Sequence, residues 1–262
     1  MPPILDEILH HARASVAPLR ARRRELERAA AEASDPPSFY AALRGGRLAL
    51  IAEVKRRSPS AGAINEGLDP VGRAGQYAGA GAAAISVLTE GPHFGGSLDD
   101  LRRVRDAVEV PLLRKDFLLD ECQLLEARAA GAAAVLLIAR VLPPARLREL
   151  VAFARDLGLG ALVDTHTERE VDVALTAEAD ILGVNARDLD TFALDPEGAW
   201  RLLAAVPASH VAVAESAMHT AEDAARAAAA GADAVLIGTA LSAAADPAAL
   251  VRQVVEVPRR GR

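Results

Sequence analysis

Apolar segments recur along the chain at regular intervals and predict buried parallel strands. In each copy, a small-residue break follows an Ala-rich helical stretch and precedes a β-branched and aliphatic run, as at a helix end that leads into a buried strand. The copies lie about fifty residues apart. They are GAAAISVL from Gly81, GAAAVLLI from Gly131, GADAVLIG from Gly231 and a degraded copy, AEADILGV, from Ala177.

Four further apolar runs lie between these copies, near residues 48–54, 111–114, 160–164 and 211–215. The eight runs are about 25 residues apart, and helical sequence such as DECQLLEARAA and TAEDAARAAAA fills several intervals. Regular alternation of this kind predicts an α/β fold, the (β/α)8 TIM barrel. A doubly wound open sheet is the alternative, but no GxGxxG fingerprint follows the first strand and the even spacing favours closure.

The residues before the first strand read as an additional helical region that either caps the barrel or covers its mouth. We therefore divide the chain into an N-terminal helical extension, residues 1–47, and a catalytic barrel, residues 48–262. A chain of 262 residues, 51% of them hydrophobic, is long enough to bury one large core.

Composition excludes several classes of function. The formal net charge of -6 argues against general binding to nucleic acids or anionic membranes. Since no segment reads as a signal peptide or membrane span, we expect a cytoplasmic protein. The single cysteine, Cys122, excludes an internal disulfide and a Cys-cluster metal site. The histidines lack metal-ligand spacing, so no metal is predicted.

Charged or amide residues end several of the apolar runs, and barrel enzymes place their catalytic groups at the carboxyl ends of the strands. Glu53 and Lys55 lie two residues apart at the end of the first strand and share one face of it. They are therefore expected to perturb each other's pKa. A buried structural ion network is the alternative, but burying so many ionisable groups without a function is costly. The candidates are Glu53, Lys55, Lys115, Asp164, Asn185 and Glu215.

A phosphate site is predicted after the last two strands, where barrel enzymes often use backbone N–H groups and a short helix N-terminus. AES at 214–216 ends one strand, and IGTALS at 237–242 ends the next and supplies Gly238 and Thr239. Alone, IGT also fits an ordinary helix N-cap. Its position in the barrel favours the phosphate interpretation.

These segments resemble the signature of the indole-3-glycerol phosphate synthase family over nearly the whole chain after about residue 40. The resemblance implies conversion of 1-(2-carboxyphenylamino)-1-deoxyribulose 5-phosphate to indole-3-glycerol phosphate in tryptophan biosynthesis, with loss of carbon dioxide and water and no external cofactor. The matching segments are IAEVKRRSPSAG from Ile51, SVLTE from Ser86, PLLRKDF from Pro111, EAR at 126–128, ILGVNARDL from Ile181, VAVAES from Val211 and AVLIGTAL from Ala234.

The resemblance also implies roles for individual residues. Ring closure develops charge on a ketone oxygen, and the resemblance makes Lys115 the general acid that protonates it. Lys55 then binds the substrate carboxylate and shares in dehydration, with Glu53 as its partner. Positions that orient the substrate are Asn185, Arg187, Glu215 and Ser58; the phosphate positions are Ser216, Ala217, Gly238 and Thr239; and Phe94 and Phe117 either contact the aromatic ring or belong to the core.

Two departures from the family pattern keep other functions open. The family has Glu where this chain has Asp164, and it has ESG where this chain has Glu215, Ser216 and Ala217. A missing methylene withdraws a carboxylate by about 1 Å, and an Ala hinders a turn that needs positive φ. The alternatives are a diverged, non-catalytic phosphosugar-binding paralogue and another phosphosugar-processing barrel enzyme. The sequence leaves both a monomer and a homodimer open.

Overall fold

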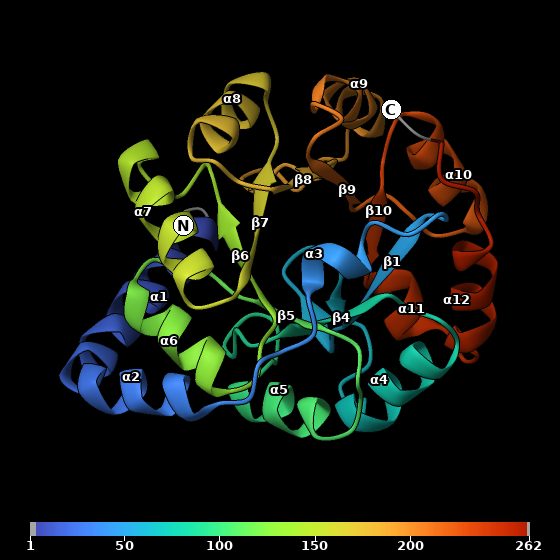
Figure 1. The fold of residues 1–262 in the computed structure, drawn as a ribbon. Coiled ribbons are helices and arrows are strands. Elements are labelled where there is room, and N and C mark those ends of the chain that lie inside the picture. The colour runs from blue at the N-terminus through green and yellow to red at the C-terminus, as the bar shows by residue number, and fades with distance from the viewer. Residues whose placement is uncertain (1–3, 261–262) are drawn as a thin grey trace.

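The computed structural model describes residues 4–260, in which eight parallel strands form a closed barrel (Figure 1). Each strand pairs with the next in chain order, and the last closes on the first. The predicted (β/α)8 barrel is confirmed, and the open sheet is excluded. The barrel strands are β1 (Ala49–Val54), β4 (Ala84–Leu88), β5 (Leu112–Lys115), β6 (Ala134–Ile138), β7 (Gly160–Thr165), β8 (Ile181–Asn185), β9 (Val211–Glu215) and β10 (Ala234–Ile237).

Helices follow the strands and surround the barrel, and a small hairpin of β2 (Arg57–Ser58) and β3 (Gly62–Ala63) lies in the β1–α4 loop. Many helices begin where an Asp, Ser or Thr side chain accepts a backbone N–H, as Asp120 does for α6 and Thr220 for α10. The helices are α4 (Pro70–Gly79), α5 (Leu98–Arg105), α6 (Glu121–Ala129), α7 (Pro144–Asp156), α8 (Glu168–Thr176), α9 (Pro196–Ala205), α10 (Ala221–Ala229), α11 (Thr239–Ala243) and α12 (Pro247–Val255).

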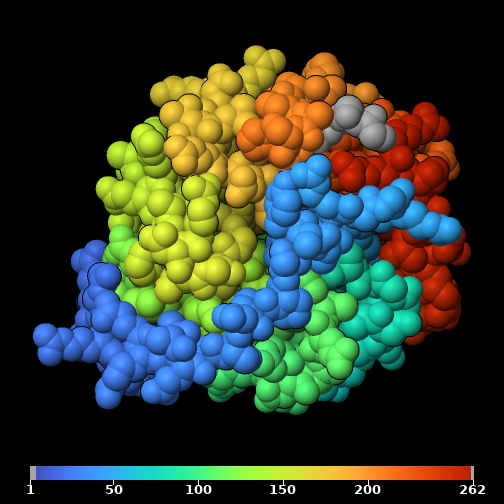
Figure 2. Space-filling model, viewed as in Figure 1, coloured from blue at the N-terminus to red at the C-terminus, as the bar shows by residue number. Residues whose placement is uncertain are grey.

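Three helices precede the barrel: α1 (Ile4–Ala21), α2 (Arg23–Glu32) and α3 (Phe39–Ala42). The first two pack along α6. Phe39 of α3 and the following Leu43 are buried against the barrel interior, next to Gly160 at the start of β7. Helix α3 therefore closes the amino-terminal end of the barrel, which faces the viewer in Figures 1 and 2, where residues of the N-terminal third cover its centre.

The extension thus caps one end of the barrel, and it also contacts a loop at the opposite end. Glu7 of α1 lies 3.8 Å from His93, in the loop that follows β4. The boundary between residues 47 and 48 stays a prediction. The ends of both predicted segments, residues 1–3 and 261–262, lie outside the described residues.

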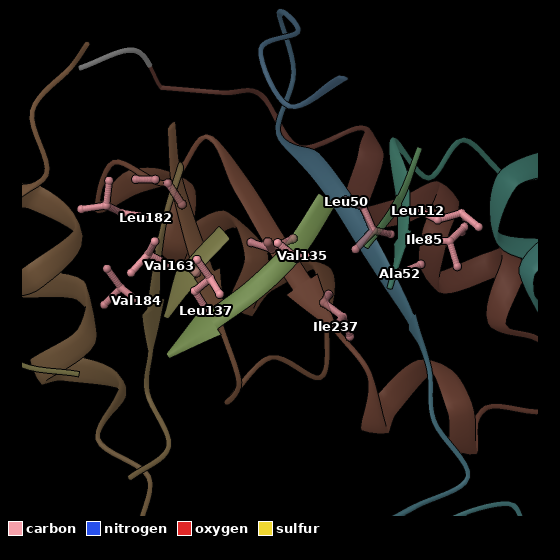
Figure 3. Close-up of a cluster of buried hydrophobic side chains, with 14 of the residues drawn as sticks. Leu50, Ala52, Ile85, Leu112, Val135, Leu137, Val163, Leu182, Val184 and Ile237 are labelled. Carbon is pink, nitrogen blue, oxygen red and sulfur yellow. The ribbon is translucent and has the colours of Figure 1, made fainter. Parts of the chain in front are cut away.

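Alternation along the strands separates the core into two layers. In β1, Ala49 and Ile51 point into the barrel, whereas Leu50 and Ala52 point outward to the helices. Within residues 4–260, no helix is both long and apolar enough to cross a bilayer. Figure 3 shows part of the outer layer, including Leu50, Ala52, Ile85, Leu112, Val135, Leu137, Val163, Leu182, Val184 and Ile237.

Candidate active site

The inward alternation continues past the apolar layer and brings the predicted polar residues to the carboxyl-terminal mouth of the barrel. Glu53 follows Ala49 and Ile51 on the inner face of β1, and Lys55, one residue after the strand ends, continues the same alternation. The same two-residue step places the side chains from the other strands in this mouth. These are Lys115 of β5, Asp164 of β7, Asn185 of β8 and Glu215 of β9.

Buried carboxylates bind both lysine ammonium groups. The Lys55 Nζ atom lies 3.0 Å from Glu53 Oε1, and the Lys115 Nζ atom lies 3.4 Å from Glu53 Oε2. Lys115 also donates a 3.3 Å hydrogen bond to Glu215 Oε2. Glu53 therefore bridges the two ammonium groups, which share one space in the mouth.

Two glycines make room for the buried glutamates. A Cβ atom on Gly183 would lie 2.2 Å from Glu215 Oε1, and one on Gly238 would lie 2.1 Å from Glu53 Oε1. Neither distance is compatible with a side chain at the glycine. Gly183 belongs to β8 and Gly238 directly follows β10, so in both cases a neighbouring strand leaves the space that the carboxylate fills.

The charges of this cluster determine its protonation. Burial alone would lower the pKa of Lys115, but the negative charges of Glu53, Glu215 and Asp164 outweigh it and raise this pKa. Burial opposes ionisation of Glu53, yet the ammonium groups of Lys55 and Lys115 hold the pKa of this carboxyl below its ordinary value. Lys115 is therefore a firmly protonated ammonium beside an ionised carboxylate.

Two other carboxyl groups have raised pKa values. Burial raises the pKa of Glu215 to about 7, against the opposing charge of Lys115. Burial also raises the pKa of Asp164, against the positive charges of His166 and Lys115. In the part of the chain that the structure describes, Asp164 Oδ1 has no hydrogen-bond partner. The mouth therefore contains one carboxyl group, Glu215, that exchanges a proton near neutral pH, and a second, Asp164, that is harder to ionise than a free aspartate.

Asn185 connects the charged cluster to the substrate-binding candidates. Its Nδ2 atom donates to Asp164 Oδ2 at 3.4 Å. Its Oδ1 atom accepts from Ser216 Oγ at 2.8 Å and from the backbone N–H of Arg187 at 3.0 Å. The amide thereby fixes the start of the β8–α9 loop relative to β7 and β9.

A cavity of about 120 Å³ opens above the cluster. Five of the six polar residues line this cavity: Glu53, Lys55, Lys115, Asp164 and Asn185. Glu215 is not in the lining, but it accepts a hydrogen bond from Lys115, which is. The rings of Phe94 and Phe117 lie 6.4 Å apart, centroid to centroid, in its wall. The predicted substrate-binding residues in the lining are Ser58, Phe94, Phe117, Arg187 and Ser216.

The other predicted phosphate residues lie beside this cavity and outside its lining. Gly238 is the N-cap residue of α11 and Thr239 is its first residue; Gly238 lies against the side chains of Glu53 and Lys55. Ser216 and Ala217 both have positive φ, 68° and 55°, so the turn after β9 adopts the left-handed conformation without a glycine. The expected conflict between Ala217 and a positive-φ turn is thus present in the backbone.

Sequence reasoning missed the apolar walls of the cavity, which Leu136, Ile138, Leu189 and Phe192 supply. Leu136 and Ile138 lie on the inner face of β6. The run AVLLI is apolar at every position, as expected for a strand buried on both faces, so it gives no signal of which side chains point inward. The mouth thus combines two cations with an apolar and aromatic wall, a combination suited to an anionic ligand with an aromatic part.

Comparison with known proteins gives consistent results. A family model described as indole-3-glycerol phosphate synthase matches residues 5–254. Indole-3-glycerol phosphate synthase 2 of Streptomyces coelicolor is 48% identical over 254 residues, which cover 96% of this chain and 98% of that protein. The indole-3-glycerol phosphate synthase of Opitutus terrae is 46% identical over 262 residues, which cover 97% of this chain and 98% of that protein.

Solved structures of lower similarity share the fold. A 3-hexulose-6-phosphate synthase from Salmonella typhimurium is 19% identical with a TM-score of 0.64, and the match covers 80% of this chain and 97% of that chain. A thiamine phosphate pyrophosphorylase from Pyrococcus furiosus is 17% identical with a TM-score of 0.60, covering 81% and 95%. At these identities the likeness shows the barrel and does not extend to the chemistry.

Proposed function

The chain belongs to the indole-3-glycerol phosphate synthase family, and we propose that Lys55 and Lys115 perform the proton transfers of the family's reaction. The reaction converts 1-(2-carboxyphenylamino)-1-deoxyribulose 5-phosphate to indole-3-glycerol phosphate in tryptophan biosynthesis. It is a carboxy-lyase reaction that closes a five-membered ring, releases carbon dioxide and then eliminates water.

Lys115 is the general acid of ring closure in this proposal. The ketone oxygen becomes negative as the ring forms, and a fixed ammonium stabilises that charge and then protonates the oxygen. Glu53 and Glu215 hold the Lys115 ammonium in place from two sides. The carboxylates therefore orient the proton donor before the substrate arrives.

Lys55 binds the substrate carboxylate and shares in the later loss of the hydroxyl group. Its ammonium is mostly buried beside Glu53, with 14% of the side chain exposed. Asp164 is the carboxylate that accepts a proton during dehydration, since it lines the same cavity and its Oδ1 atom is free of hydrogen bonds in the described part of the chain. Asn185 orients Asp164 for this step.

The remaining cavity residues hold the two ends of the substrate. Phe94 and Phe117 contact the aromatic ring, while Arg187 and Ser58 are suited to the anionic and hydroxyl groups. The loops after β9 and β10 supply Ser216, Ala217, Gly238 and Thr239 for the phosphate. We expect no external cofactor. A cytoplasmic location and the choice between monomer and homodimer stay predictions.

The observation that carries the proposal is the ammonium pair on Glu53, with Asp164 lining the same cavity. A second, independent fact supports it. Lys55 and Lys115 are the only lysines among the 30 lysine and arginine residues of the chain. Arginine meets every other need for positive charge, but it does not release a proton in proteins. Lysine is thus present only where we propose proton transfer.

The test is to incubate the pure protein with the carboxyphenylamino substrate and follow indole fluorescence. Lys115→Arg keeps the charge but cannot donate a proton, so kcat is expected to fall at least about a hundredfold while substrate still binds. Lys115→Met removes the charge as well as the proton, so both turnover and substrate binding are expected to be lost. Arg24→Met, which removes an exposed cation from α2, serves as the control.

Three outcomes would contradict the proposal in different ways. Substrate binding without product in the unmodified protein favours a non-catalytic paralogue. Absence of both binding and product favours another phosphosugar enzyme. Full turnover by Lys115→Arg leaves the family activity in place but removes Lys115 as the proton donor.

A further inference from the structure

His166 interacts electrostatically with the proposed catalytic carboxylate, Asp164, and has no part in the mechanism above. It follows Asp164 by two residues, at the end of β7, and only 5% of its side chain is exposed. Its Nε2 atom lies 2.8 Å from the carbonyl oxygen of Arg187. A carbonyl oxygen only accepts, so Nε2 carries a hydrogen and donates it.

The other ring nitrogen also faces an acceptor. His166 Nδ1 lies 3.4 Å from Glu170 Oε2, within ion-pair range but without the geometry of a hydrogen bond. An ionised carboxylate cannot donate, so an unprotonated Nδ1 would oppose its lone pair to a negative oxygen. Glu170 is held in this position because its Oε2 atom accepts the backbone N–H of His166 at 2.6 Å. Both ring nitrogens are therefore placed for the doubly protonated, cationic form.

The charged groups around the ring favour the same form. Asp164 of β7 and Glu170 of α8 are the carboxyl groups near the ring, while Arg140, in the loop after β6, is positive and binds Glu170 Oε1 at 3.2 Å. Burial lowers the pKa of His166, but the charges of Asp164 and Glu170 outweigh burial and Arg140 and raise this pKa above its ordinary value. In turn, the imidazolium opposes the effect of burial on the pKa of Asp164.

The Arg187 carbonyl belongs to the β8–α9 loop, residues 186–195, which supplies Arg187, Leu189 and Phe192 to the cavity. The backbone N–H of Arg187 is held by Asn185, and its carbonyl oxygen is held by His166. Arg140 contacts the same loop through Asp188 at 2.9 Å. His166 and Arg140, joined by Glu170, therefore fasten this loop from the neighbouring strands.

We propose that His166 is a cationic positioning residue for the reaction: it fixes the loop that carries Arg187 and places a positive charge near Asp164, which favours the ionised form of that carboxyl. The inference rests on the proposed function, because both effects act on turnover. It assigns two separable tasks to one ring, a hydrogen bond from Nε2 and a positive charge. One substitution can remove the charge and keep the hydrogen bond, and another can remove both.

His166→Gln keeps a donor at the Nε2 position and removes the charge, whereas His166→Ala removes both. For His166→Gln we expect KM within about twofold of the unmodified value and an acid limb of kcat/KM that moves to higher pH, because Asp164 loses a neighbouring cation. For His166→Ala we expect the same shift and a KM raised by about tenfold, from the lost hydrogen bond to the loop. His10→Gln, an exposed histidine of α1, is the control.

A measurement on the unmodified protein does not depend on turnover. In ¹⁵N-histidine-labelled protein, with the His166 signals assigned by their loss in His166→Gln, both ring nitrogens are expected to be protonated at pH 7.5. Glu170→Gln is expected to lower the pH at which the second proton leaves. A neutral His166 ring at pH 7.5, or an unshifted acid limb in His166→Gln, would overturn the inference. If the unmodified protein forms no indole product, the proposed function fails, whatever the His166 variants do.

Discussion

At the scale of single residues, the use of lysine separates chemistry from surface charge. The chain has two lysines, and both ammonium groups contact Glu53 in the barrel mouth. The basic residues of the surface are all arginine, as in the ion pairs that Arg22 and Arg23 form at the start of α2. Exposed pairs of this kind contribute little to stability, so either basic residue would serve there. Arginine cannot replace lysine as a buried proton donor, because arginine does not release a proton in proteins.

Asp164 is the residue whose length departs from the family pattern, and its effect on turnover is directly testable. Asp164→Ala is expected to lower kcat at least about a hundredfold, because it removes the carboxylate that accepts a proton. Asp164→Glu is expected to preserve or raise kcat, since the longer side chain reaches about 1 Å further into the cavity. Steady-state kinetics check both, with Asp164→Asn as the variant that keeps shape without charge. An unchanged kcat in Asp164→Ala would remove this residue from the mechanism.

Ala217 shows how the chain accommodates its second departure. The left-handed conformation costs a non-glycine residue about 1 to 2 kcal/mol, and here two successive residues, Ser216 and Ala217, adopt it. The surrounding contacts maintain the turn: Ser216 donates to Asn185, and Ala217 packs against the outer core layer. The turn after β9 therefore keeps its shape through packing and not through backbone freedom.

At the scale of elements, the sequence predicts what depends on local chemistry. Small-residue breaks before aliphatic runs located four strands, and the apolar runs between them located the other four. The strand ends located the six charged or amide residues of the mouth. The placement of α3 was not predictable, because the four-residue segment FYAA has no pattern that distinguishes a plug at the bottom of the barrel from a cover at its mouth. Its partners, Phe39 included, are set by long-range packing.

The cavity walls were also beyond prediction, for a related reason. Leu189 and Phe192 come from the β8–α9 loop, and a loop sequence does not state which side chains turn toward the barrel axis. Tertiary contacts decide this, through the bonds that hold the Arg187 backbone. The sequence thus predicts which polar residues gather in the mouth, while the shape of its apolar part cannot be predicted from it.

Strand β8 has no side chain at Gly183, and the space left there holds the Glu215 carboxylate. A substitution at Gly183 tests whether this space matters. In Gly183→Ala the new Cβ would meet Glu215 Oε1 at 2.2 Å and displace the carboxylate from Lys115. We expect kcat/KM to fall by about tenfold or more, since a misplacement near 1 Å can cost about a hundredfold. Steady-state kinetics measure the loss.

A control and a rescue make this test specific. Gly75→Ala in α4 has no atom within 4 Å of the new Cβ, so activity should be unchanged and stability should rise by about 1 kcal/mol. Adding Glu215→Asp to Gly183→Ala shortens the displaced side chain and should recover part of the activity. Unchanged kinetics for Gly183→Ala alone would contradict the prediction, because they would mean that Glu215 can adopt another conformation without loss of activity.

At the scale of the whole molecule, the fold carries a charged cluster at one end of its core, although the chain as a whole is negative, with a formal charge of -6. If all were ionised, Glu53, Asp164 and Glu215 would outnumber Lys55 and Lys115 by one charge. Burial raises the pKa of Glu215 to about 7. Protonation of this carboxyl therefore removes the excess negative charge of the cluster. An anionic substrate adds further negative charge and should favour uptake of this proton.

The same proton makes stability depend on pH. Glu215 has a folded pKa of about 7, above its ordinary value of 4.5, so its contribution is fully present below pH 4.5 and is lost as pH rises through 7. Glu215→Gln resembles the protonated carboxyl at every pH. From pH 5 to pH 8, its free energy of unfolding should therefore rise relative to the unmodified protein by about 2 kcal/mol, since one unit of pKa corresponds to about 1.4 kcal/mol. Urea unfolding across this range measures the difference, with the exposed Glu222→Gln as control. A difference that stays flat, or that falls with pH, would mean that Glu215 is ionised throughout and that the excess proton lies elsewhere in the cluster.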